Sequence, residues 1–112
     1  MDGIYAAYLS GKTGSSVGIF LFKGGAVSGA DIGGAIYDGE YVTSQDGLYI
    51  VGTLTMDAPQ NTPLITGTSA VGPNSKMAIP LRLPTSFSEN DVFKIETPAG
   101  PVNAKFRKIR SL

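Results

Sequence analysis

The chain has 112 residues, the length of one ordinary domain, and its charges balance at nine basic and nine acidic residues. It contains no cysteine and no histidine, which excludes disulfides, thiolate or imidazole metal ligands, and Ser-His-Asp or Cys-His catalytic groups. Charged residues make up 16% of the chain, below the usual ~25%, while glycine is abundant at 15 residues. This composition predicts a single β domain over residues 1–112 that is not an enzyme and needs no metal or cofactor.

Short runs of alternating apolar and polar residues, separated by turn residues, dominate the chain, and no window sustains helical periodicity. Eight such runs in sequence predict an all-β fold, an eight-stranded antiparallel up-and-down barrel, because closure removes exposed strand edges. In chain order the expected strands are Gly3–Ser10, Ser16–Lys23, Ala26–Ala30, Ala35–Thr43, Leu48–Asp57, Met77–Leu83, Val92–Thr97 and Val102–Ile109.

The connections carry recognisable turn signals. Gly11–Gly14 and Gly24-Gly25 can supply the positive φ of tight hairpins, and Asp46-Gly47 is the strongest hairpin signal in the chain. Ser86–Glu89 matches a capping box and predicts a single helical turn. One long loop, at about 58–76, is either a functional loop or the site of a ninth short strand at Leu64–Thr66.

Alternation also assigns a face to most side chains. The apolar set is expected to point into the barrel: Tyr5, Ala7, Leu9, Ala35, Tyr37, Tyr41, Leu48, Ile50, Leu54, Met56, Phe93, Ile95, Ala104 and Phe106. An eight-stranded barrel holds either packed side chains or one small ligand. If it holds a small apolar ligand, the residues expected to bind it are Tyr5, Tyr37, Tyr41, Ile50, Phe93 and Phe106.

The second strand is apolar on both faces. We assign Val17, Ile19 and Leu21 to the interior, which leaves Phe20 and Phe22 outside. A strand that is apolar on both sides is usually covered on both, so a dimer interface is expected there. The expected interface residues are Phe20, Phe22, Tyr49 and Val51. The alternatives to an interface are a local bulge, or the long loop folding over this face.

The remaining charged patterns give only weak indications of a functional site. Asp38 and Glu40 share one strand face, where paired carboxylates are usually solvated rather than catalytic. The basic C-terminus, with Lys105, Arg107, Lys108 and Arg110, is either a patch for an acidic partner or an outward face that protects a strand edge. Neutral net charge argues against a nucleic-acid partner.

Several segments in order resemble one family of small bacterial proteins. They are Asp2-Gly3-Ile4-Tyr5, Gly18-Ile19, Lys23-Gly24-Gly25, Gly29-Ala30-Asp31-Ile32, Tyr37-Asp38-Gly39, Ala78-Ile79-Pro80 and Ala104-Lys105-Phe106. In this respect the chain resembles the GrlR family, negative regulators of type III secretion genes. The resemblance implies a lipocalin-like or calycin-like barrel that dimerises, encloses a modest apolar cavity and regulates by binding a transcriptional activator.

In that family the hairpin after Tyr-x-Gly can carry an acidic run used for partner binding, whereas Thr43–Gly47 holds one acid. The sequence therefore leaves two alternative functions. One is a non-enzymatic regulator that acts through protein–protein binding as a homodimer; the other is a carrier or sensor of a small apolar ligand. The N-terminus lacks the pattern of a signal peptide and no stretch is apolar enough to cross a membrane, so we expect a cytoplasmic protein without membrane contact.

Overall fold

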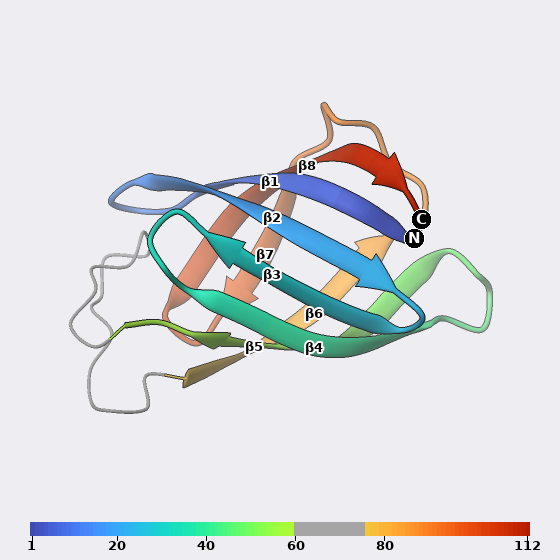
Figure 1. The fold of residues 1–112 in the computed structure, drawn as a ribbon, viewed down its shortest axis with the longest axis horizontal. Coiled ribbons are helices and arrows are strands. Elements are labelled where there is room, and N and C mark those ends of the chain that lie inside the picture. The colour runs from blue at the N-terminus through green and yellow to red at the C-terminus, as the bar shows by residue number, and fades with distance from the viewer. Residues whose placement is uncertain (60–75) are drawn as a thin grey trace.

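A computed structural model describes residues 1–59 and 76–112 (Figure 1). The described chain forms one antiparallel sheet of eight strands, as the sequence predicted. The possible ninth strand at Leu64–Thr66 lies outside the described residues. The strands are β1 (Gly3–Ser10), β2 (Ser15–Lys23), β3 (Ala26–Asp31), β4 (Ile36–Thr43), β5 (Tyr49–Asp57), β6 (Lys76–Pro84), β7 (Phe93–Thr97) and β8 (Gly100–Ser111).

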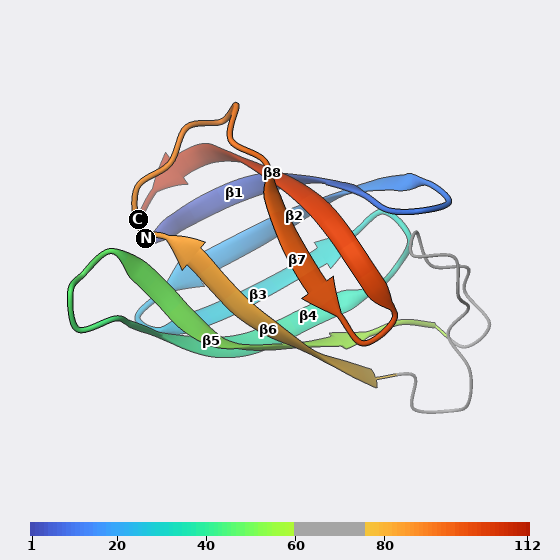
Figure 2. The same cartoon turned by 180° about the vertical axis from the view of Figure 1, so that it is seen from behind.

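The sheet curls into a nearly closed up-and-down barrel. Each strand pairs with its neighbour in sequence except β6 with β7, and β8 pairs with β1 to join the two ends of the chain. Figure 2 shows the two edge strands, β6 and β7, on the same side of the barrel. Pro80 and Pro84 lie in β6 and β7 is only five residues long, features that discourage another chain from pairing with these edges.

The hairpin turns follow from their residues. Gly24 and Gly25 have φ of 59° and 84°, which fits the two-residue turn that joins β2 to β3. Asp46 lies in the turn between β4 and β5, where its carboxylate accepts a hydrogen bond from the amide of Leu48 at 3.0 Å. A hydrogen bond from the Ser44 hydroxyl, and after it the bond from Leu48, lower the pKa of Asp46. The hairpin expected at Asp46-Gly47 is therefore confirmed.

Three local expectations were wrong. Leu48 belongs to the β4–β5 turn and is exposed, because β5 begins one residue later. Gly11 and Gly14 do not have positive φ, since the β1–β2 turn closes instead through a bond from the Gly11 amide to the Gly14 carbonyl. Ser86–Glu89 is not helical. Instead, the Ser88 amide donates a hydrogen bond to the Asp91 carboxylate at 2.9 Å.

The core is apolar, and no polar or charged residue of the described chain is buried as a whole. Apart from Leu48 and the residues of β2, the side chains that alternation assigned to the interior are buried or packed against the core, which confirms that part of the prediction. The buried set is contributed by β1, β2, β3, β4, β5, β6 and β8, and Phe87 in the β6–β7 loop packs onto it.

The assignment of the two faces of β2 was wrong. Phe20 and Phe22 point inward and are 5% and 2% exposed, whereas Ile19 and Leu21 lie outside at 50% and 40%. The reason is the register of the β1–β2 hairpin, which places Phe20 opposite Tyr5. Directly opposed residues of paired strands share a face, so an inward Tyr5 requires an inward Phe20. Phe20 and Phe22 cannot form the expected dimer interface.

Candidate ligand cavity

One end of the barrel is filled by aromatic side chains. The Tyr5 and Phe22 rings pack edge to face with centroids 5.4 Å apart, and Phe22 and Tyr41 pack at a tilt with centroids 5.6 Å apart. Phe87 comes in from the β6–β7 loop and packs against Tyr5 and Phe93. This packed end is the end at which both termini lie in Figure 1. Aromatic contacts of this kind leave little room for a ligand.

The opposite end of the barrel is hollow. A cavity of about 360 Å³ opens between the β1–β2, β3–β4 and β7–β8 turns, which lie together on the left of Figure 1. Its size is near the lower limit of small-molecule sites, which span about 300–1,000 Å³. Apolar side chains from opposite walls line it: Leu9, Phe20, Phe22, Val27, Ala35, Tyr37, Leu54, Met56, Ala58, Met77, Ile79, Leu81, Ile95, Val102 and Phe106.

The polar centre of the cavity mouth is Asp31 at the end of β3. Its carboxylate accepts hydrogen bonds from the amides of Gly33 at 2.9 Å and Ala35 at 3.1 Å, which fixes the β3–β4 turn. Its other oxygen accepts the hydroxyl of Tyr37 at 2.7 Å. Burial, followed by this hydrogen bond, raises the pKa of Tyr37 well above its ordinary value. The Tyr37 hydroxyl is therefore neutral and already committed to Asp31.

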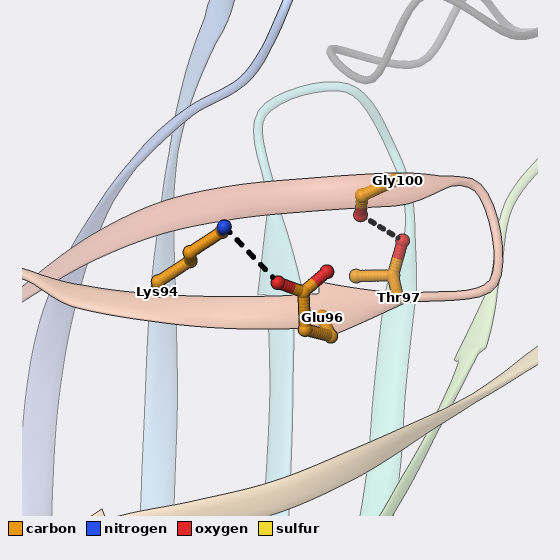
Figure 3. A network of polar contacts seen from close by, with 4 residues as sticks. All are labelled: Lys94, Glu96, Thr97 and Gly100. Atoms are coloured by element: carbon orange, nitrogen blue, oxygen red, sulfur yellow. Dashed lines mark hydrogen bonds and ion pairs between the residues drawn. The ribbon is translucent and has the colours of Figure 1, made fainter.

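Three further hydroxyl residues line the cavity, the exposed Ser15 together with Thr97 and Ser16, and the last two differ in their partners. Thr97 Oγ1 donates to the Gly100 carbonyl at 2.6 Å, within the turn that Figure 3 shows beside the exposed Lys94–Glu96 ion pair. It also accepts from the Ala99 amide at 3.2 Å, so the turn fully occupies it. Ser16 Oγ, on the inner face of β2, is shielded from water and has no hydrogen-bond partner in the described structure.

The structure separates the six residues expected to bind a ligand. Tyr37 and Phe106 line the cavity, as predicted. Tyr5, Tyr41, Ile50 and Phe93 point inward but lie in or toward the packed end, and they are not among the described lining residues. Their assignment to the ligand site was therefore wrong. Alternation reveals which side chains face inward, but it does not tell how far along the barrel the open space lies.

Sequence reasoning missed the wall made by β2, β5 and β6. Leu54 and Met56 had been placed inside without a ligand role, and Phe20 had been placed outside. A signal for Phe20 was present: a turn at Gly11–Gly14 sets Ser10 opposite Ser15, and counting back along both strands sets Tyr5 opposite Phe20. Ser16 carried no such signal, because a half-buried serine at a strand end has no distinctive pattern.

Metal binding finds no support in the described parts of the chain. No group of three or more acidic side chains gathers within residues 1–59 and 76–112 in a way that could hold an ion. Within the same ranges, no helix has the length and apolarity needed to cross a membrane.

The chain matches no family model and no curated protein. The cavity presents apolar walls and one carboxylate whose oxygens are engaged. Such a surface can bind an apolar molecule.

The outer surface carries a second feature, an apolar face over β1 and β2. The register sets Ala6, Ile19 and Ala30 side by side, with Ile36 next in the row on β4. Ile19 and Ile36 are among the most exposed apolar side chains of this face. Tyr49 and Val51, the other two residues of the expected interface, lie on β5 outside the barrel, where Tyr49 stacks under the Arg82 guanidinium at 3.9 Å.

Proposed function

We propose that the protein binds a small apolar molecule in the open end of the barrel, as a carrier or sensor without enzymatic activity. The observation that carries the proposal is the half-filled interior: aromatic rings pack one end, and an apolar cavity of about 360 Å³ remains at the other. A cavity lined almost wholly by carbon stabilises an apolar guest by removing its surface from water, at roughly 25 cal/mol per Å². The strand framework forms the site before the ligand arrives, so little ordering opposes binding.

A fluorescence titration tests the proposal. N-phenyl-1-naphthylamine (NPN), an uncharged probe that brightens in apolar sites, is expected to bind the wild-type protein with saturable enhancement. Ala35→Leu adds a side chain at the cavity mouth and should weaken NPN binding about tenfold or more, whereas Ala78→Leu adds the same side chain on the outer face of β6 and should leave it unchanged. Absence of saturable binding, or equal loss in both variants, would overturn the proposal.

A second role is supported by the outer surface. We propose that the apolar face around Ile19 and Leu21 binds a second copy of the chain, and that the dimer acts as a cytoplasmic regulator by protein–protein binding. The support is the charge on either side of this face. Arg107 on β8 borders it on one flank, and Asp38 and Glu40 on β4 border it on the other. A two-fold axis along β2 would set the basic flank of one copy against the acidic flank of the other.

The dimer has its own test. Ile19→Glu and Leu21→Glu place a carboxylate in the centre of the outer apolar face and should produce folded monomers in solution scattering. Thr53→Glu, on the outer face of β5, is the matched control and should remain dimeric. A wild-type protein that is monomeric at high concentration would rule out the dimer while leaving the ligand cavity untouched.

A further inference from the structure

We infer that the ligand is an amphiphile with a monoanionic head, whose apolar tail enters the barrel cavity and whose head stays outside, on Lys105. The inference rests on the proposed function, because it assigns a chemical class to the ligand of the same cavity. Two observations carry it. The cavity continues over the rim of the barrel into a groove on the outer surface, and that groove holds a lone cation.

The groove joins the cavity at the hollow end of the barrel. Residues of the β1–β2 hairpin and the β3–β4 turn line both spaces: Leu9, Ser15, Ser16 and Ile32. Ile32 is 77% exposed, more than any other large apolar side chain of the described chain. A ligand that leaves the cavity over Ile32 removes this apolar surface from water, which favours a ligand longer than the cavity itself.

The strand register arranges the groove as one row across the outer face. Lys105 on β8 is opposite Tyr8 on β1, and Tyr8 is opposite Val17 on β2. The Ile32 amide, just after β3, donates to the Val17 carbonyl at 3.0 Å, which places Ile32 next in the row. Tyr8 and Val17 therefore form an apolar path between the cavity mouth and Lys105.

The charge of the groove selects the head. Lys105 is the one charged side chain among the described residues that line it, and Lys105 makes no ion pair with another described residue. The nearest carboxylate of the cavity mouth, Asp31, is on β3, three strand spacings or about 14 Å from β8. This exceeds the Debye length of about 8 Å at physiological salt, so Asp31 repels a head on Lys105 only weakly.

The head stays outside because the cavity would remove its water. The described residues that line the cavity include no lysine or arginine, so a carboxylate drawn fully inside would be desolvated without a partner. On the exposed Lys105 the head keeps most of its hydration and gains a surface ion pair. Such pairs are weak, so the expected selectivity between heads is modest and depends on salt.

Two ligands of equal chain length test the head. Decanoate and decyltrimethylammonium are compared, below their critical micelle concentrations, by their displacement of NPN from the wild-type protein. At low salt we expect decanoate to bind about threefold to fivefold more tightly, and the difference to shrink at high salt. Equal binding of the two, or tighter binding of the cation, would overturn the inference.

Lys105→Gln tests the cation itself. It should weaken decanoate about threefold to fivefold and leave NPN unchanged, because only the ion pair is lost. Lys105→Arg keeps the charge and should bind decanoate like the wild type. Lys23→Gln makes the same change at the opposite end of β2 and should alter neither ligand. Unchanged decanoate binding by Lys105→Gln, or an equal loss of decanoate and NPN, would contradict the role of Lys105.

Ile32→Ser tests the path over the rim. It should weaken decanoate about threefold or more, because the tail loses an apolar contact. Ile36→Ser is the matched control, an isoleucine that is 61% exposed on the outer face of β4, and it should leave decanoate unchanged. Equal affinities of the two variants would show that the tail does not pass over Ile32. If NPN itself fails to bind the wild type, the proposed function fails first, so the two failures are distinguishable.

Discussion

Phe20 and Phe22 illustrate what decides the face of a residue. Both faces of β2 carry apolar side chains, so alternation alone allows either face to be buried. The hairpin register then selects the face that holds the phenylalanines, and Gly29 on the neighbouring strand makes room for Phe20. A Cβ on Gly29 would lie 2.5 Å from the Phe20 ring, which is closer than any packed carbon. The smaller Ile19 and Leu21 are left on the outside.

Truncation of adjacent residues in β2 tests this assignment. Phe22→Ala removes a ring that is 2% exposed and should lower the free energy of unfolding by about 3–5 kcal/mol, measured by denaturant titration. Leu21→Ala removes a side chain from the outer face and should cost under about 1 kcal/mol. A larger loss for Leu21→Ala than for Phe22→Ala would mean that the faces are reversed.

Tyr37 should make stability depend on alkaline pH. Its pKa is raised in the folded protein, by burial first and by the bond to Asp31 second. Above about pH 10 the unfolded chain loses the Tyr37 proton while the folded chain keeps it, so folding binds a proton and stability falls as pH rises. The stability that Tyr37 contributes by keeping its proton is therefore complete below about pH 10 and falls progressively above it.

Replacing Tyr37 with phenylalanine should flatten this pH dependence. Across about pH 10–12, the free energy of unfolding of the wild type should fall more steeply than that of Tyr37→Phe, by up to about 1.4 kcal/mol per pH unit. At neutral pH the variant should lose about 1 kcal/mol with the bond to Asp31. Parallel curves for the two proteins would contradict the assignment.

At the scale of the element, the β6–β7 connection closes the packed end where the ladder of hydrogen bonds is interrupted. β6 and β7 are neighbours in the barrel without being paired, and the loop between them sends Phe87 into the core. Its ring lies 5.5 Å from Phe93 and 6.1 Å from Phe106, measured between centroids. Side-chain packing from the loop thus takes the place of strand pairing at this end.

Phe87→Ala should therefore destabilise the barrel more than its place in a loop suggests. We expect a loss of about 2–4 kcal/mol in the free energy of unfolding, because three aromatic partners lose a neighbour. Val92→Ala, in the same loop and exposed, should cost under about 0.5 kcal/mol. Thermal unfolding of the two variants compares them directly, and similar melting temperatures would show that Phe87 does not close the barrel end.

The elements themselves could largely be predicted from the sequence. Alternation and turn residues located all eight strands of the described chain to within two residues at every end, because strand period and glycine turns are local properties. The position of the basic strand β8 was harder to predict. One interpretation of its charge was that this strand protects an edge of the sheet. In the structure β8 lies between β1 and β7, because the barrel closes through β8 and opens between β6 and β7. Which pair of strands stays open is a property of the whole barrel.

At the scale of the whole molecule, the division into a filled and a hollow end determines the function we propose. Inward-facing side chains were predictable one strand at a time, yet their heights along the barrel depend on the stagger of all eight strands. Tyr5 and Tyr37 both point inward, but Tyr5 packs with Phe22 while Tyr37 reaches Asp31 at the cavity mouth. The sequence therefore predicted an apolar interior without locating the empty part of it.

Methyl NMR with NPN as ligand tests the central claim most directly, because it reports where the ligand lies. Ile79 and Ile95 line the cavity, whereas Ile19 and Ile36 lie on the outer face, so the four δ1 methyls distinguish the two surfaces within one residue type. We expect saturable shifts of Ile79 and Ile95 and little change at Ile19 and Ile36. Shifts confined to Ile19 and Ile36 would show binding to the outer face and would contradict a ligand-binding barrel.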